Sequence, residues 1–171
     1  HGVNYANAYL ETIGQRPSQT RPLKTWPYKA GAKVKLFVLA GHRNMEGERA
    51  FVQELKSMRG KSSLLKDNHH IAFRYSIGGG YKVSAGWEPL GPAGYYDTFG
   101  PELSFGAAVG RKLRDGVAVA KFTHSGSQII DWTPAGSEAA TRNLYPSFIA
   151  FVRECLQEIR DHGQEVELAG I

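Results

Sequence analysis

Residues 33–41 read Lys-Val-Lys-Leu-Phe-Val-Leu-Ala-Gly, a short and nearly continuous apolar run that decides the fold class. Its branched and aromatic side chains predict a β-strand, and its two apolar faces place that strand inside a parallel sheet. Residues 117–122, Val-Ala-Val-Ala-Lys-Phe, have the same character, and residues 166–171 begin a third strand. The sequence therefore predicts a sheet built mainly from buried parallel strands.

Helical patterns alternate with these strands. Apolar residues recur at helical spacing over residues 51–58 and again over residues 101–113. The longest helix is expected to open at Pro146. Strands that alternate with helices predict an α/β protein, here a three-layer α/β/α sandwich around a parallel sheet of flavodoxin-like type. The buried face of the longest helix is expected to contain Ile149, Val152, Leu156 and Ile159.

A chain of 171 residues, 42% of them hydrophobic, is long enough for one core. Residues 1–31 show no sustained period and predict an irregular basic N-terminal arm, followed by one α/β domain over residues 32–171. Residues 12–45 hold seven Lys and Arg but no Asp or Glu, against a net charge of +5 for the whole chain. This segment is either solvated or meets phosphates or an acidic polysaccharide.

Composition excludes several classes of protein. No run approaches the ~20 apolar residues of a membrane helix, so no span is expected. The single cysteine, Cys155, excludes an internal disulfide and a thiolate metal cluster made by this chain alone. His69 and His70 are adjacent, and consecutive residues rarely share one ion. We therefore expect no metal and no cofactor.

Residues 61–100 have the least regular pattern. Residues 71–77 alternate weakly and predict a strand, and the glycines at 78–80 end it. A long loop rich in glycine, proline and aromatic residues is expected to follow. Its rings either offer flat surfaces to sugars or pin the loop to the core, and both interpretations stay open. The rings belong to Trp87, Tyr95, Tyr96 and Phe99.

Ligands in open parallel sheets bind beyond the carboxyl ends of the strands. Two polar, glycine-containing turns follow predicted strands here: Gly-His-Arg-Asn-Met-Glu-Gly at 41–47 and His-Ser-Gly-Ser at 124–127. Both turns are expected to face one crevice. The candidate ligand-binding residues are Gly41, His42, Arg43, Asn44, Ser125, Gly126 and Ser127.

Four ordered segments resemble one enzyme family. Residues 37–47, Phe-Val-Leu-Ala-Gly-His-Arg-Asn-Met-Glu-Gly, resemble the first block of the SGNH hydrolases, in the branch of sialate O-acetylesterases and acetylxylan esterases, usually Leu-Ala-Gly-Gln-Ser-Asn-Met-Glu-Gly. Residues 99–106, Phe-Gly-Pro-Glu-Leu-Ser-Phe-Gly, are similar to its Phe-Gly-Pro-Glu-Leu-Gly-Phe-Gly segment. Residues 121–132 and 167–171 resemble its Gly-Gly oxyanion block and the strand before its third block. The resemblance implies an SGNH fold and hydrolysis of acetylated carbohydrates by serine acyl transfer.

The chain departs from this family at its catalytic positions. Arg43 stands where the family has its nucleophilic serine, and a guanidinium that stays protonated cannot attack an acyl carbon. His42 replaces a glutamine, and Ser125 replaces one glycine of the Gly-Gly pair. The resemblance leaves Gly126 and the backbone N–H of Arg43 as oxyanion donors. His124 and Ser125 are adjacent, so their side chains are expected to point apart and form no serine–histidine pair.

The sequence given ends before the family's Gly-Glu-Ser/Asn-Asp block and its Asp-x-x-His block. We therefore expect a sheet that is incomplete at its carboxyl-terminal side, completed by further chain or by a partner. The absent initiator methionine and the family's action on polysaccharides predict a secreted or periplasmic protein.

Two functions from different classes follow. The first is a carbohydrate O-acetylesterase-like hydrolase domain, impaired because Arg43 occupies the nucleophile position. The second is a non-catalytic module that binds a glycan or another anion on the same scaffold. In the second case Arg43 holds a carboxylate or sulfate of an acidic glycan, unless it forms a salt bridge within the fold, for example to Glu46 or Glu102. Nucleic acid is disfavoured as a partner because residues 46–171 carry 14 bases against 15 acids.

Overall fold

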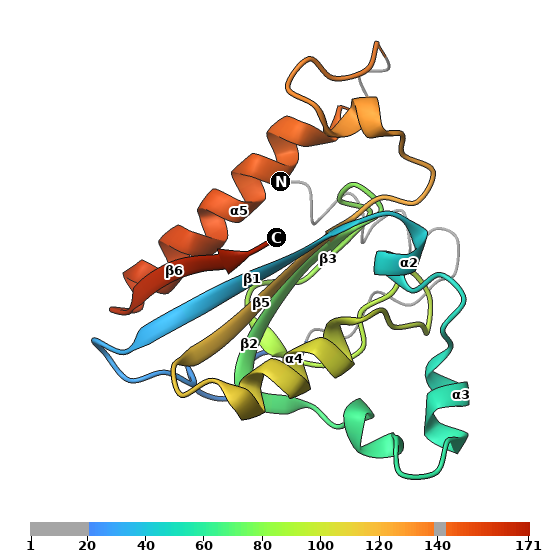
Figure 1. The fold of residues 1–171 in the computed structure, drawn as a ribbon. Coiled ribbons are helices and arrows are strands. Elements are labelled where there is room, and N and C mark those ends of the chain that lie inside the picture. Colours follow the sequence, from blue (N-terminus) through green and yellow to red (C-terminus); the bar gives the residue numbers. More distant parts are fainter. Residues whose placement is uncertain (1–20, 139–142) are drawn as a thin grey trace.

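The computed structural model describes residues 21–138 and 143–171 (Figure 1). In these ranges no helix is both long and apolar enough to cross a membrane. The strands are β1 (Lys33–Gly41), β2 (Asn68–Ile77), β3 (Lys82–Val83), β4 (Glu88–Leu90), β5 (Gly116–Thr123) and β6 (Glu165–Gly170). The helices are α2 (Arg43–Glu46), α3 (Val52–Ser57), α4 (Glu102–Lys112) and α5 (Leu144–Asp161), with 3-10 turns η1 (Ser62–Leu65) and η2 (Ile129–Trp132).

The strands form one six-stranded sheet in the order β3-β2-β5-β1-β6, with β4 paired to β2. β5 lies at its centre, parallel to β1 on one side and to β2 on the other, and β1 is in turn parallel to β6. The two short strands β3 and β4 run antiparallel to β2. The predicted α/β class with a mainly parallel sheet is therefore confirmed.

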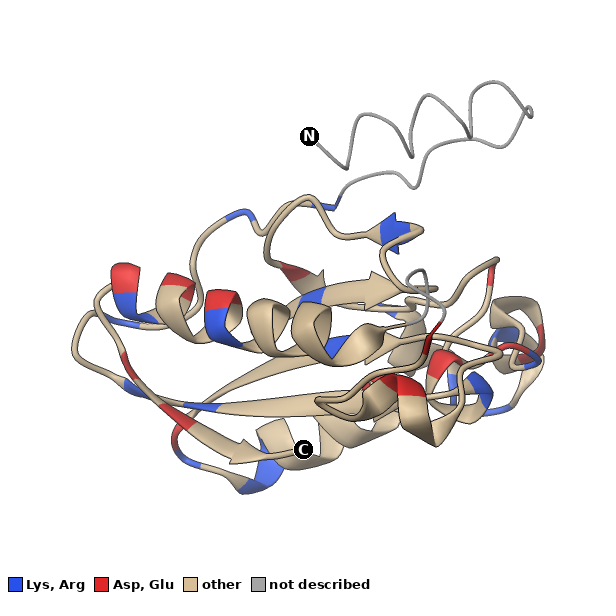
Figure 2. Ribbon diagram, turned by 90° about the horizontal axis from the view of Figure 1, so that it is seen from above, with Lys and Arg blue, Asp and Glu red and all other residues tan. Residues whose placement is uncertain are grey.

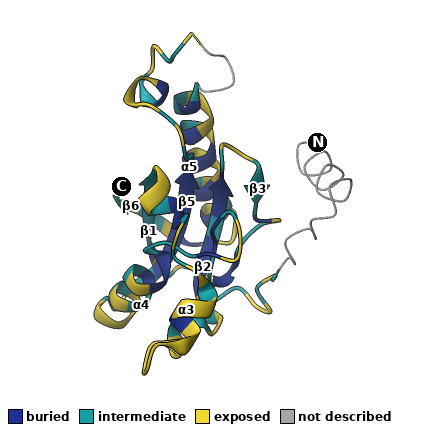
Figure 3. Cartoon of the chain, turned by 90° about the vertical axis from the view of Figure 1, so that its right-hand side faces the viewer, coloured by how far each residue is buried: buried dark blue, intermediate teal, exposed yellow. Residues whose placement is uncertain are grey.

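Each face of the sheet packs against its own helix, because successive side chains of a strand point to opposite faces. Val34, Leu36 and Val38 of β1 join one buried cluster with the inner face of α5. Leu39, with Phe73 and Val119, joins a second cluster that includes Phe105 and Val109 of α4. Figure 3 shows the central strands buried while the outer sides of the helices are exposed. Burial of each such side chain contributes about 1.5–3 kcal/mol.

The longest helix differs from its prediction. α5 begins at Leu144, two residues before Pro146, which a first helical turn tolerates because the N–H of that turn has no partner within the helix. Its buried face is also rotated: Ile149 and Leu156 are only partly buried. The rings of α5 pack against Phe122 of β5, and this aromatic contact centres the face. The buried residues of α5 are Leu144, Phe148, Phe151, Val152, Cys155 and Ile159.

The irregular region 61–100 contains more order than its pattern predicts. β2 begins at Asn68, three residues before the expected strand. β3 and β4 have two and three residues, too few to show a period. Both are held by β2, so tertiary pairing rather than local propensity forms them.

Residues 21–31 contain neither helix nor strand and pack on the domain. The Trp26 ring stacks on His162, with centroids 4.0 Å apart. The Tyr28 hydroxyl donates to the Val117 carbonyl and accepts from the Ala72 N–H at 2.9 Å, which ties this segment to β5 and β2. The earlier part of the predicted arm, residues 1–20, lies outside the described residues.

Among the described residues, several cations of the predicted basic segment form ion pairs on the folded domain. Arg21 pairs with Asp67 at 2.6 Å, and Lys33 and Lys35 both lie 2.9 Å from the Glu167 carboxylate. Figure 2 shows basic and acidic residues interspersed over the described chain. Basic residues that are close together in the sequence therefore lie among acidic residues in the folded domain.

Candidate functional site

The two predicted turns lie side by side at one edge of the sheet. β1 and β5 are parallel and in register up to Gly41 and Thr123, so the segments that follow them emerge together. The His124 N–H donates to the Gly41 carbonyl at 3.1 Å, and the Gly126 N–H donates to His42 Nε2 at 2.8 Å. The structure thus brings the two turns together, while the pocket beside Arg43 is lined by residues between 43 and 50 and by none of Ser125, Gly126 and Ser127.

The bond between His42 and Gly126 decides what this turn can bind. A ring nitrogen that accepts a hydrogen bond carries no proton, so His42 holds its proton on Nδ1 in this arrangement. The same bond occupies the Gly126 N–H, which the resemblance assigns to an oxyanion. Because a donor already engaged at 2.8 Å must exchange partners to reach a new acceptor, this amide is no ready-made oxyanion donor.

The hydroxyl groups of this turn are not arranged as nucleophiles. Ser127 Oγ donates to the His124 carbonyl at 2.7 Å and accepts from Trp132 Nε1 at 3.0 Å. Ser125 Oγ is buried with no hydrogen-bond partner. The His124 ring contacts the Ser125 carbonyl oxygen at 2.8 Å, not its hydroxyl. Neither serine hydrogen-bonds an imidazole, which agrees with the expectation for adjacent residues.

Arg43 is the most accessible charge of the site. Its side chain is 59% exposed, and Nε lies 3.4 Å from the Glu48 carboxylate. The alternative of a salt bridge within the fold is confirmed, with Glu48 as the partner instead of Glu46 or Glu102, whose carboxylates are buried and bonded elsewhere. An exposed ion pair of this length contributes little and leaves guanidinium N–H groups for a ligand.

An open pocket of about 390 Å³ adjoins Arg43. Its charged and polar lining consists of Arg43, Asn44, Glu48 and Arg49, with Gly47 and Ala50 completing it. Arg49 is exposed and has no ion pair among the described residues. Two guanidinium groups against one carboxylate give this pocket a positive balance. Sequence reasoning missed Arg49, because no local signal shows that the chain turns back after α2.

A buried network of charged side chains holds α2, the helix that carries Arg43, in place. Lys121 and Glu102 are both 0% exposed, and their Nζ and Oε2 atoms lie 2.7 Å apart. Lys121 also donates to the carbonyls of Ala93 at 2.7 Å and Glu46 at 3.2 Å. Burial lowers the pKa of Lys121, an effect that Glu102 opposes. Because Glu46 ends α2, this lysine holds the short helix that carries Arg43.

A second part of the network ties the two strands of the site together. The Thr123 hydroxyl at the end of β5 donates to the buried Glu46 carboxylate at 3.2 Å. The Glu102 carboxylate accepts the N–H groups of Gly100 at 3.0 Å and Ala93 at 3.1 Å, which fixes the loop before α4. Sequence reasoning missed these residues, since charged side chains on a helix usually face solvent.

Tyrosine rings lie next to the His124 turn. Tyr81 and Tyr95 stack with centroids 4.6 Å apart, and Tyr96 meets Tyr95 edge to face and is 59% exposed. The glycines after β2 allow this closeness: a Cβ at Gly79 would lie 2.6 Å from the His124 ring. Tyr96 therefore offers an exposed ring beside Tyr95.

The other two rings of the predicted loop act as anchors. Trp87 is partly buried, packs on the α5 side of the core, and meets Trp26 edge to face at 5.9 Å. Phe99 is also partly buried, and its backbone approaches Gly47 so closely that a Cβ there would lie 1.8 Å from the Phe99 carbonyl oxygen. The anchoring interpretation is therefore confirmed for Trp87, and the interpretation that other rings face sugars stays a prediction.

Metal binding finds no support in the part of the chain that the structure describes. Residues 21–138 and 143–171 contain no group of three His, Cys, Asp or Glu side chains that could hold an ion.

Comparison of the chain with family models, with curated proteins and with solved structures found no match.

Proposed function

We propose that this chain is a non-hydrolytic domain that binds acidic carbohydrate on a carbohydrate-esterase-like scaffold. The scaffold proposed is the three-layer α/β/α sandwich of the SGNH type, and its support is the pair of helices, α4 and α5, that pack on opposite faces of the sheet. The SGNH resemblance itself rests on the sequence blocks alone. A role on polysaccharide fits a secreted or periplasmic protein.

One observation carries the proposal: the Gly126 N–H is bonded to His42 Nε2. In the resembled enzymes the turn matching residues 124–127 supplies a donor to the oxyanion, and the position matching Arg43, two residues after Gly41, holds the nucleophilic serine. Here Arg43 replaces the serine and His42 occupies the donor. Ester hydrolysis by that route requires both a nucleophile and stabilisation of the developing oxyanion, so the arrangement favours binding without turnover.

The ligand class follows from the pocket beside Arg43. Two guanidinium groups and the Asn44 amide can donate to a carboxylate or sulfate, and arginine binds such planar or branched oxyanions through paired N–H groups. The exposed Tyr96 ring, which meets Tyr95 edge to face, suits the apolar face of a sugar. A uronate or sulfated oligosaccharide therefore meets both features better than a neutral acetylated sugar does.

A second candidate function is carbohydrate O-acetylesterase activity. The observation that favours it is the meeting of the 41–47 and 124–127 turns at the carboxyl edge of the sheet, where α/β enzymes place their active sites. It would require a nucleophile other than Arg43.

The two candidates are separated by assaying 4-nitrophenyl acetate hydrolysis and oligosaccharide binding on the same preparations. We expect no hydrolysis above that of an unrelated protein of similar charge, and calorimetric binding of uronate oligosaccharides that Arg43→Ala weakens. The matched control is Arg59→Ala, which removes an exposed arginine outside the site. Hydrolysis by the unaltered chain that a serine-directed phosphonate abolishes would overturn the proposal. Equal affinity of the Arg43→Ala and Arg59→Ala variants for the oligosaccharide would show that Arg43 does not contribute to binding.

A further inference from the structure

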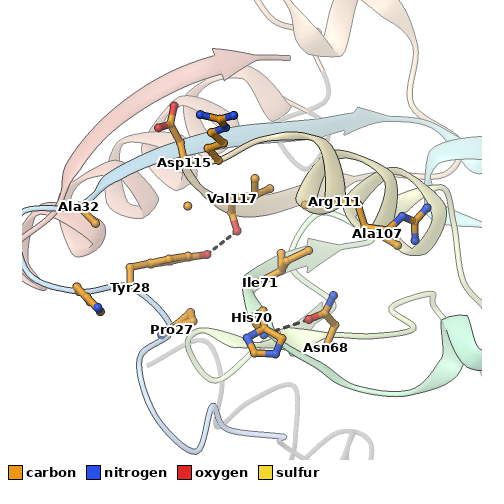
Figure 4. A pocket seen from close by; sticks show the side chains of 14 residues that line it. Pro27, Tyr28, Ala32, Asn68, His70, Ile71, Ala107, Arg111, Asp115 and Val117 are labelled. Carbon is orange, nitrogen blue, oxygen red and sulfur yellow. Dashed lines mark hydrogen bonds between the residues drawn. The ribbon is translucent and has the colours of Figure 1, made fainter.

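A second pocket lies at the opposite end of the sheet (Figure 4). It has a volume of about 510 Å³, within the range of small-molecule sites, and its wall includes the first residues of β2 and β5, Asn68 and Gly116. Since parallel strands share their amino edge, this pocket is separated from the Arg43 site by the length of the sheet. Its lining combines the Tyr28 and Ile71 side chains with the polar or charged side chains of Asn68, His70, Arg111 and Arg114.

The floor of this pocket is apolar and rigid. Figure 4 shows the Tyr28 ring reaching across to the backbone of Val117, with Ile71 beside it. The Tyr28 hydroxyl is fully used by Val117 and the Ala72 N–H, so the ring is held in place. A Cβ at Gly116 would lie 2.8 Å from that ring, which shows how tightly the floor is packed. A flat apolar surface of this kind suits the body of a ring-bearing ligand.

The rim carries unneutralised positive charge. Lys29, Arg111 and Arg114 are all exposed, and none forms an ion pair with a carboxylate among the described residues. The one acid of the lining, Asp115, lies 3.9 Å from Lys35, a cation outside the pocket. Figure 4 shows Asp115 and His70 on opposite sides of the pocket, with the Asp115 carboxylate directed away from His70. The pocket lining therefore has three cations against one acid.

Polar groups from β2 complete the rim. Asn68 and His70 face the pocket from the start of the strand, and Asn68 Oδ1 accepts the His70 N–H at 3.0 Å. That bond uses the amide oxygen of Asn68, so its NH₂ group remains a donor. Guanidinium, ammonium, amide and imidazole donors around an apolar floor are the groups that bind tetrahedral oxyanions attached to a ring.

We propose that this pocket binds an oxyanion ester, a phosphate or sulfate group carried on a ring. Arg111 and Arg114 hold the oxyanion, and the Tyr28 floor holds the ring. The site is independent of the Arg43 pocket, because no residue lines both.

The test is titration of the ¹⁵N-labelled chain with phenyl phosphate, phenyl sulfate and phenol, followed by the same titrations on two double variants. We expect millimolar or tighter binding of at least one ester, with amide shifts at Asn68, His70 and Arg111, and weaker binding of phenol. Arg111→Ala/Arg114→Ala should lower the affinity for the ester by about tenfold or more. The control, Arg153→Ala/Arg160→Ala, removes two exposed arginines of α5 and should leave the affinity unchanged.

Each result bears on the proposal. Tighter binding of the phosphate or of the sulfate identifies which oxyanion the pocket prefers. Absence of ester binding, shifts confined to other residues, or equal weakening in both double variants would overturn the proposal, since the last would show attraction by net charge alone. Both variants change exposed side chains without ion pairs, and unchanged thermal unfolding would show that they retain the fold.

Discussion

The buried Lys121 gives the sharpest stability prediction. Its Nζ makes three hydrogen bonds, to Glu102 Oε2 at 2.7 Å and to the carbonyls of Ala93 at 2.7 Å and Glu46 at 3.2 Å, while both charged partners are 0% exposed. Lys121→Met removes the positive charge and leaves a buried carboxylate without its cation. Breaking a buried pair in this way costs about 3–5 kcal/mol.

Urea unfolding followed by tryptophan fluorescence and circular dichroism measures this loss. The control, Lys112→Met, makes the same chemical change at an exposed position of α4 and should alter the free energy of unfolding by less than about 0.5 kcal/mol. Adding Glu102→Gln to Lys121→Met should restore part of the stability, because the neutral amide still accepts backbone N–H groups. A loss below about 1 kcal/mol for Lys121→Met would refute the reasoning.

Three further predictions concern Tyr28 and Cys155, which lie outside the Arg43 pocket. Tyr28→Phe leaves the Val117 carbonyl and the Ala72 N–H without their shared partner, so urea unfolding should show a loss of about 1–3 kcal/mol, and an unchanged midpoint would count against this anchor. Burial raises the pKa of the Cys155 thiol to about 12, so a disulfide reagent at pH 8 should label it only after unfolding. A raised pKa contributes stability that is present below the ordinary value of 9.0 and lost as pH rises toward 12, so Cys155→Ala should flatten the fall in stability over that interval. Rapid labelling of the thiol in the folded chain would contradict both the burial of Cys155 and its raised pKa.

The strands and the meeting of the two turns could be predicted because each depends on one strong local signal. A run such as residues 33–41 is apolar on both faces only when a sheet covers both, and the carboxyl ends of neighbouring parallel strands share an edge by geometry. These two facts are enough to bring His42 and Gly126 to the same place.

The chemistry at that place could not be predicted, since it depends on which charged side chains turn inward. Glu46 and Glu102 resemble ordinary surface acids of helices in sequence, yet both are buried by contacts with β5. Arg43 therefore pairs with Glu48 instead, because that is the acid left exposed near it. Tertiary contacts of this kind leave no periodic signal in the chain.

The start of α5 was mispredicted for a related reason. Proline is common at the first helical position, but the first turn as a whole tolerates it, so Pro146 marks that turn rather than its first residue. The buried face of α5 is set by the contacts of Phe148 and Phe151 with Phe122 of β5. The spacing of apolar residues along the helix does not reveal these contacts.

The measurement that tests the central claim most directly is calorimetric titration of the unaltered chain with an oligogalacturonate and with a neutral xylo-oligosaccharide, alongside Arg43→Ala. The account predicts binding of the acidic ligand that weakens by about tenfold in Arg43→Ala and with added salt, little binding of the neutral one, and an unaltered ligand after the titration. Equal affinity for both ligands, no effect of Arg43→Ala, or release of acetate from an acetylated form of the neutral ligand would contradict it.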